Sequence, residues 1–150
     1  MVVVGPEDPL VLGIADWCEE AGIPCFGTSA YCAQIEGSKH FAKDMMKKSG
    51  VPTASYAVFS DHGSAWGYAQ KELLPLVVKA DGLAAGKGVT VAFELSDVKR
   101  ALDEIFLESK FGKSGSKVVI ESFLEGEEAS LFVITDGDRS MCLPAAQDHK

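Results

Sequence analysis

The sequence predicts an α/β fold in which the end of a parallel-sheet domain is followed by a smaller α+β unit. Two observations support this prediction. Residues 1–27 follow the order strand, helix, strand, which is the repeat of parallel sheets. Residues 76–93 contain two short apolar runs around a glycine-rich loop, the pattern of a hairpin. One strand–helix–strand unit cannot form a sheet alone, so we expect it to belong to a domain begun upstream.

Apolar spacing and turn residues predict the other elements. We expect caps at Thr28-Ser29, Ser38, Ser60-Asp61 and Ser96, and a hairpin turn at Asp136-Gly137. Helices are expected over residues 9–22, 28–50, 63–73 and 94–111. Strands are expected over residues 1–4, 23–27, 51–59, 76–79, 89–93, 117–121, 129–135 and 141–143.

Composition narrows the class of protein. The 150 residues are 47% hydrophobic and 24% charged, with a net charge of −8, so sequence-independent binding to nucleic acid is disfavoured. No apolar run reaches the roughly 18 residues of a membrane span. Residues 1–4 lack a basic flank and meet Gly5-Pro6, unlike a signal peptide. We therefore expect a cytoplasmic protein with neither a nucleic-acid nor a membrane partner.

The cysteine pattern does not indicate a metal site. None of the cysteines forms a C-x-x-C pair, and the three histidines do not cluster with them in the sequence. Reduced, mostly buried thiols are expected in a cytosolic protein. The cysteines are Cys18, Cys25, Cys32 and Cys142.

The glycine-rich loop between Lys79 and Val89 is the strongest functional signal in the chain. It contains Gly82, Gly86, Lys87 and Gly88. Glycines allow close approach of the backbone to a ligand, and successive free N–H groups can form an anion-binding concavity. Lysines beside the loop supply compact positive charge. The loop predicts a nucleoside triphosphate held under a hairpin lid, with an ordinary glycine-rich hairpin as the alternative.

Other phosphate loops fit less well. Gly88 occupies the place of the Ser or Thr of a Walker loop, and the residues that follow are β-branched and favour a strand. The glycine spacing also departs from G-x-G-x-x-G. Since a hairpin tolerates β-branched residues, we expect valine at Gly86 and Gly88 to preserve the fold.

A second set of residues follows the strand at 117–121. The strand end from Glu121 to Leu124 offers backbone groups that can pair with an adenine edge, and Leu124 can pack on the ring. Seven residues beyond Glu121, Glu128 can accept hydrogen bonds from both ribose hydroxyls. The alternative is a solvated acidic turn. The position of these residues one strand–helix–strand unit after the lid favours a nucleotide site.

The ordered motifs resemble the phosphoribosylamine–glycine ligase family of the ATP-grasp superfamily. The resemblance covers essentially the whole chain. It rests on E-G-S-K at 36–39, V-K-A-D-G-L-A-A-G-K-G-V at 78–89, E-S-F-L-E-G-E-E-A-S at 121–130 and Q-D-H-K at 147–150, with G-P-E-D-P-L at 5–10 similar to the family's N-terminal domain. It implies an ATP-grasp fold and ATP-dependent ligation of glycine to 5-phosphoribosylamine through glycyl phosphate, with Mg²⁺ or Mn²⁺.

The resemblance also implies roles for residues. Lys39 and Lys79 match the family's ATP-phosphate lysines, and residues 82–89 match the lid. Positions 121–124, which are Glu121, Ser122, Phe123 and Leu124, match the adenine hinge. Glu128 matches the ribose carboxylate and Lys150 a further phosphate-side lysine. Gly5, Pro6 and Glu7 would lie near the phosphoribosylamine site, and Asp148 would be a further substrate-binding residue.

The family pattern extends beyond both ends of the chain. We expect residues 1–30 to end the N-terminal domain, 31–55 to begin the ATP-grasp domain, 56–123 to form the lid subdomain and 124–150 to begin the catalytic core. The family's metal-binding acid and asparagine are expected downstream, so no metal ligand is expected within this chain. We expect the fragment alone to be inactive. The alternatives are another ATP-grasp carboxylate–amine ligase and a nucleotide-binding module without catalysis.

Overall fold

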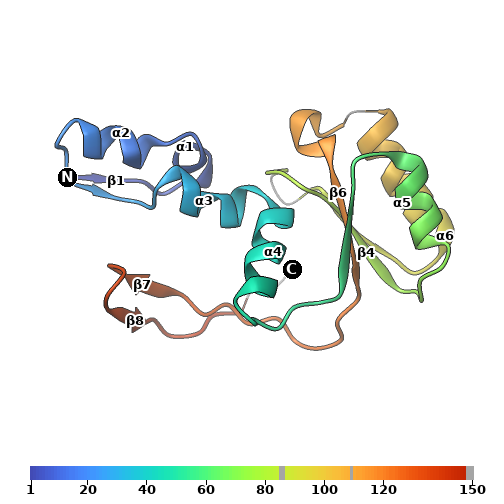
Figure 1. Cartoon of the computed structure of the whole chain (residues 1–150). Coiled ribbons are helices and arrows are strands. Elements are labelled where there is room, and N and C mark those ends of the chain that lie inside the picture. The colour runs from blue at the N-terminus through green and yellow to red at the C-terminus, as the bar shows by residue number, and fades with distance from the viewer. Residues whose placement is uncertain (85–86, 109, 148–150) are drawn as a thin grey trace.

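A computed structural model describes residues 1–84, 87–108 and 110–147. The N-terminal segment forms a small α/β unit, drawn in blue in Figure 1. Its two strands pair in parallel, Val2 with Cys25 and Val3 with Phe26, which confirms the predicted parallel pairing. Its elements are β1 (Val2–Val3), α1 (Glu7–Val11), α2 (Ile14–Glu20), β2 (Cys25–Phe26) and α3 (Ala30–Gly37).

Two helices that the sequence predicted as continuous are interrupted. The helix expected at 9–22 is divided into α1 and α2 by Gly13, whose φ of 94° lies in the left-handed region that glycine adopts easily. The helix expected at 28–50 is divided at Ser38, where an extended backbone separates α3 from α4 (Lys39–Lys48). Ser29 caps α3 by accepting from the Cys32 N–H, and Ser38 caps α4 by accepting from the Phe41 N–H.

A four-stranded antiparallel sheet with the order β3-β6-β4-β5 forms the centre of the second unit. The predicted hairpin around the glycine-rich loop is confirmed, since β4 pairs with β5. Helices α5 and α6 cover one face of the sheet, and α4 lies on the other side (Figure 1). The elements are β3 (Tyr56–Phe59), α5 (His62–Ala69), β4 (Leu76–Ala80), β5 (Val89–Ala92), α6 (Leu95–Leu102), the π-helical turn η1 (Asp103–Leu107), the 3₁₀ turn η2 (Gly112–Ser116) and β6 (Val118–Ser122).

Several boundaries differ from the sequence expectation. The strand expected at 51–59 is confined to β3, after Pro52, which cannot donate to a sheet ladder. The helix expected at 94–111 changes to a π-helical turn at Asp103. Ser96 does not cap α6, because the helix already begins at Leu95 with Glu94 as its N-cap residue. Asp61 does cap α5, by accepting from the Ser64 N–H at 2.8 Å.

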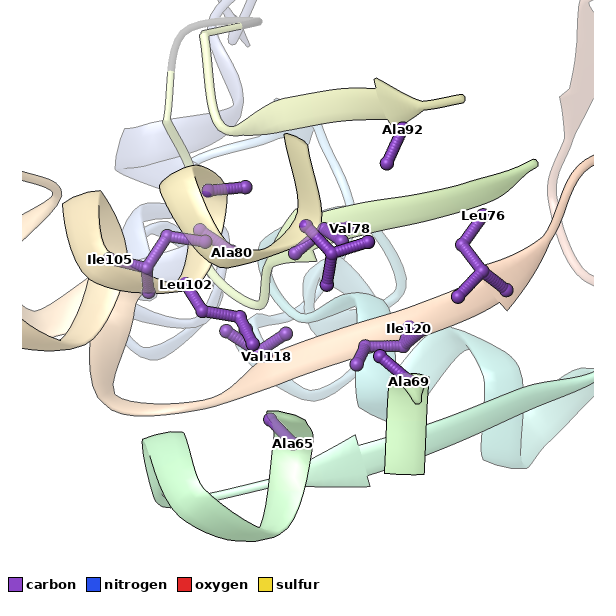
Figure 2. Close-up of a cluster of buried hydrophobic side chains, with 12 residues drawn as sticks. Ala65, Ala69, Leu76, Val78, Ala80, Ala92, Leu102, Ile105, Val118 and Ile120 are labelled. Carbon is purple, nitrogen blue, oxygen red and sulfur yellow. The ribbon is translucent and has the colours of Figure 1, made fainter. Parts of the chain in front are cut away.

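The core lies between the sheet and the two helices on its first face. Alternate residues of β4 and β6 point into it, as Leu76, Val78, Val118 and Ile120 show in Figure 2. Helix α6 contributes Leu102, which is fully buried. With Val98 and Ala101, which are also buried, Leu102 forms the core face of this helix.

The last described segment forms a separate hairpin. Strands β7 (Val133–Thr135) and β8 (Ser140–Cys142) pair antiparallel around the turn predicted at Asp136-Gly137. All four cysteine thiols are free, but Cys32 and Cys142 are exposed, so the expectation of mostly buried thiols is wrong. Among the described residues, none of the helices is both long and apolar enough to span a membrane.

The core predicts a large loss of stability when Leu102 is truncated. Leu102→Ala should reduce the free energy of unfolding by about 2–5 kcal/mol, because it removes a fully buried side chain and leaves a cavity. Urea unfolding followed by circular dichroism measures the change. The matched control is Leu73→Ala, whose side chain is 90% exposed and whose truncation should cost less than about 0.5 kcal/mol. Equal losses in the two variants would contradict this assignment of the core.

Candidate functional site

The second face of the sheet, opposite the core, carries charged side chains beside apolar ones such as the fully buried Val119. Because Leu76, Val78 and Ala80 face the core, alternation places Lys79 on the opposite face of β4. Register pairs Lys79 with Val119 and places Glu121 two residues along β6 on the same face. Lys79 and Glu121, which the sequence assigned to the phosphate and adenine sides, therefore meet on one face.

Glu121 is buried between two lysines. Its side chain is 6% exposed, and its Oε2 lies 2.9 Å from Lys43 Nζ, while its Oε1 lies 3.1 Å from Lys79 Nζ. The contact with Lys79 is an ion pair without hydrogen-bond alignment, so among the described residues the buried Oε1 has no hydrogen-bond partner. A buried acceptor in that state is suited to a donor group of a ligand.

Lys43 is the residue of this cluster that sequence reasoning missed. It lies on α4 and is 8% exposed, and its ammonium group donates to Thr53 Oγ1 at 2.7 Å as well as pairing with Glu121. A signal was present, since residues four apart share one face of a helix and Lys43 follows Lys39 by four. The same spacing continues to Lys47, which is exposed, so spacing alone does not single out Lys43.

Lys39 is tied to the base of the lid through the start of α4. The Lys39 N–H donates to the Asp81 carbonyl at 3.0 Å, and Lys39 Nζ donates to the Gly82 carbonyl at 3.0 Å. The Asp81 carboxylate accepts from the His40 N–H at 2.7 Å and from Ser38 Oγ at 3.1 Å. Asp81, which directly follows β4, thus adds a second acceptor to the N-terminal cap of α4.

The environment of Lys39 suits an anionic ligand. Burial lowers the pKa of the Lys39 ammonium group below its usual range, against the opposing effect of the Asp81 carboxylate, and the nearby Lys79 lowers it further. An anion at this position would offset both the burial and the repulsion between the two lysines.

The lid glycines described here are required by packing. A Cβ at Gly82 would lie 2.9 Å from the Ser114 Cα, and a Cβ at Gly88 would lie 2.7 Å from the Ala84 Cβ. Neither glycine has a left-handed backbone. The structure therefore disfavours the valine that we expected at Gly88, because the added side chain meets its neighbours. Lys87 is exposed, and Gly86 lies outside the described residues.

The predicted hinge follows directly from the end of β6. Ser122 donates its N–H to the Ser55 carbonyl at 3.0 Å, whereas Phe123 and Leu124 are exposed beyond the sheet. The Phe123 ring lies 6.3 Å from the ring of Phe93, measured between centroids. Glu128 lies in the exposed segment that follows, before the bridge between Ser130 and Ala146.

Three of the four residues predicted on the substrate side lie in the N-terminal unit. Gly5, Pro6 and Glu7 are exposed between β1 and the first turn of α1. Gly5 and Glu7 line a groove of about 430 Å³, together with Leu10, Thr28, Cys32, Ala33, Ile35 and Glu36. Asp148 and Lys150 lie outside the described residues. In residues 1–84, 87–108 and 110–147, no group of three or more His, Cys, Asp or Glu side chains is arranged to hold a metal ion.

Comparison with known proteins gives matches over the whole chain. The family model described as "Phosphoribosylglycinamide synthetase, N domain" matches residues 1–36, and the model described as "Phosphoribosylglycinamide synthetase, ATP-grasp (A) domain" matches residues 37–150. The phosphoribosylamine–glycine ligase of Leptospira interrogans is 57% identical over all 150 residues, which are 35% of its length. The chain therefore spans about a third of the relatives that it matches.

Solved structures agree with these sequence matches. The crystal structure of phosphoribosylamine–glycine ligase from Thermotoga maritima matches with a TM-score of 0.79 and 30% identity, over 95% of this chain and 34% of that one. D-Alanine–D-alanine ligase from Helicobacter pylori matches with a TM-score of 0.70 and 21% identity, over 89% of this chain and 40% of that one. At that identity the second match shows the fold alone.

The cap formed by Asp81 predicts a measurable stabilisation of α4. Asp81→Ala should lower the free energy of unfolding by about 1–2 kcal/mol, because the His40 N–H and the Ser38 hydroxyl lose their acceptor. Urea unfolding measures the loss. Asp138→Ala is the control, since this exposed aspartate lies at the tip of the β7–β8 hairpin. Identical unfolding midpoints for both variants would show that the cap is not stabilising.

The packing of the lid predicts opposite effects at two glycines. Gly88→Ala should destabilise the protein by about 1–3 kcal/mol, because its Cβ enters filled space beside Ala84 and Ala80. Gly67→Ala in α5 meets nothing within 4 Å and should be neutral or stabilising, because alanine favours a helix. Thermal unfolding of the two variants compares them. Stability of Gly88→Ala equal to that of the unchanged protein would contradict the packing explanation.

Proposed function

Because this chain belongs to the phosphoribosylglycinamide synthetase family, with parts of its N domain and its ATP-grasp domain, we propose that the protein that carries it ligates glycine to 5-phosphoribosylamine. ATP drives the reaction, and the products are glycinamide ribonucleotide, ADP and phosphate. The observation that carries the proposal is the meeting of Lys79, Glu121 and the Lys39-bearing end of α4 beside the base of the lid.

The lysines supply the phosphate side of the proposed ATP site. Lys39 reaches the base of the lid through the Gly82 carbonyl, and Lys79 leaves the sheet on the face opposite the core. Two ammonium groups in this position neutralise charge on the polyphosphate, which phosphoryl transfer needs more than covalent help from the protein. In this proposal Gly82, Gly86, Lys87 and Gly88 form the lid over the phosphates, and Lys150 is a further phosphate-side lysine.

The adenine and ribose sides are proposed at the end of β6. The backbone of residues 123 and 124, beyond the end of β6, can pair with the adenine edge. Glu121 Oε1 contacts Lys79 as an ion pair but makes no hydrogen bond among the described residues, so it retains acceptor capacity beside the proposed base site. The exposed Leu124 side chain can cover the base. The Glu128 carboxylate can accept from the ribose hydroxyls.

The proposed reaction has two chemical steps. A glycine carboxylate oxygen attacks the γ-phosphorus of ATP, and the bond to the bridging oxygen of ADP breaks. The amine of phosphoribosylamine then attacks the carbonyl carbon of the acyl phosphate, loses a proton and releases phosphate. Closure of the lid excludes the water that would hydrolyse the acyl phosphate. We propose a requirement for Mg²⁺ or Mn²⁺, for which the described residues provide no ligand set.

The groove of the N-terminal unit is the proposed phosphoribosylamine side. Its two carboxylates, Glu7 and Glu36, suit the ribose hydroxyls and the amine of that substrate better than its phosphate. At Gly5 and Pro6, beside Glu7, the substrate can approach the backbone closely. Asp148 is proposed as a further substrate-binding residue. With this function we propose a division of the chain into the segments 1–30, 31–55, 56–123 and 124–150. We also propose a cytoplasmic location.

A different ATP-grasp ligase and a binding module without catalysis remain the competing functions. The match with D-alanine–D-alanine ligase extends to the fold, whereas the match at 57% identity is with a phosphoribosylamine–glycine ligase. An assay of the complete protein with ATP, Mg²⁺, glycine and phosphoribosylamine separates the possibilities. Glycine-dependent release of ADP with formation of glycinamide ribonucleotide supports the proposal. ATP binding without glycine-dependent turnover would favour the binding module.

Lys79 provides a direct test of the proposed ATP site. Lys79→Ala should reduce ATP binding and transition-state stabilisation by a combined total of about 2–5 kcal/mol, because it removes a charge pair at a largely desolvated position. Calorimetric titration with ATP and kcat/KM for ATP measure the loss. The control is Lys99→Ala, because Lys99 is exposed on α6, away from this face. Unchanged ATP binding and turnover in Lys79→Ala would remove Lys79 from the site.

A further inference from the structure

The proposed function leaves one charged residue of the second sheet face unused. Lys43 is 8% exposed and lies on α4, one turn beyond Lys39. Its Nζ contacts Glu121 Oε2 at 2.9 Å and Thr53 Oγ1 at 2.7 Å, and lies 5.7 Å from the centroid of the Tyr56 ring. These contacts direct its ammonium group toward the sheet.

A buried lysine is unfavourable unless its charge is paired. Lys43 meets that requirement through the same carboxylate that pairs with Lys79, since the two lysines contact different oxygens of Glu121. The bond from Lys43 fixes the orientation of the carboxylate, and the carboxylate in turn sets the position of Lys79 Nζ. Lys43 also places a second positive charge beside Glu121. The negative charge of Glu121 is therefore shared between two lysines, and each is held less strongly than it would be as the sole partner.

We infer that Lys43 is a positioning residue, which acts through Glu121 to hold Lys79 ready for the phosphates of ATP. The inference rests on the proposed function in one respect, namely that Lys79 contacts the nucleotide. Without Lys43, Glu121 has Lys79 as its only ion-pair partner among the described residues, and the two groups pair with each other instead of presenting Lys79 to the ligand. Removal of Lys43 should therefore weaken the binding of ATP and leave the binding of glycine unchanged.

The experiment uses Lys43→Met in the complete protein, with Lys47→Met as the matched control on the same helix. Lys47 is exposed, so its variant should behave as the unchanged protein. Lys43→Met should raise the dissociation constant for ATP by about tenfold or more and raise KM for ATP, with KM for glycine unchanged. Lys43→Arg, which keeps the charge, should recover part of the affinity. A folded Lys43→Met that binds ATP as tightly as the control overturns the inference.

A double-variant cycle tests whether Glu121 transmits the effect. In the Glu121→Gln background, Lys43→Met should change ATP affinity by less than about twofold, because the link between the two lysines is already broken. A further tenfold loss in that background would overturn the inference. This comparison also serves if Lys43→Met alone does not fold, because the double variant leaves no unpaired carboxylate.

The two proposals fail in different ways. An unchanged protein that binds ATP but forms no glycinamide ribonucleotide refutes the proposed reaction, while ATP titration still decides the role of Lys43. An unchanged protein that does not bind ATP refutes both. Normal ligation with equal ATP affinity in Lys43→Met and Lys47→Met refutes the role of Lys43 alone.

Discussion

The arrangement of the site depends on one buried carboxylate. Glu121 lies at the end of β6 and joins Lys43 of α4 to Lys79 of β4. The contacts thereby bring together, at one face of the sheet, three segments that are far apart in the sequence. Removing one partner from such a cluster leaves a buried charge poorly compensated, whereas apolar replacement of a whole buried pair is often tolerated. The cluster is thus better understood as specifying this arrangement than as a large source of stability.

The same strands serve two different purposes because side chains alternate along them. In β4, Val78 enters the core while its neighbour Lys79 leaves on the opposite face. In β6, Ile120 and Glu121 divide in the same way. A shift of register by one residue would place charges in the core and apolar groups at the site. Packing of α5 and α6 against the first face therefore also fixes the geometry of the second.

Local patterns predicted the parts of the fold that depend on neighbouring residues. The hairpin around the lid, the parallel pair of β1 and β2, and the cap at Asp61 follow from short-range signals. The sequence predicted a cap at Ser38 but one helix over residues 28–50. It did not predict that a helix ends at Gly37, because apolar residues recur on both sides of Ser38. The ion pair of Lys43 with Glu121 and the packing of Gly82 against Ser114 depend on long-range contacts that spacing does not encode. The contact of Asp81 with α4 belongs to the same class, since it joins residues about forty positions apart.

If the proposed ATP site is correct, the hydrogen bond from Lys39 to the Gly82 carbonyl affects how a phosphate is held at the start of the lid. An incoming phosphate oxygen competes with a neutral carbonyl for the same ammonium group, so capture is an exchange of acceptors. The net gain in affinity is smaller than for an unengaged lysine, because one bond is lost as another forms. Departure of the anion is correspondingly easier, since the carbonyl takes its place. In the proposed site, the contact at the lid base would thus favour release of the anion over its tight retention.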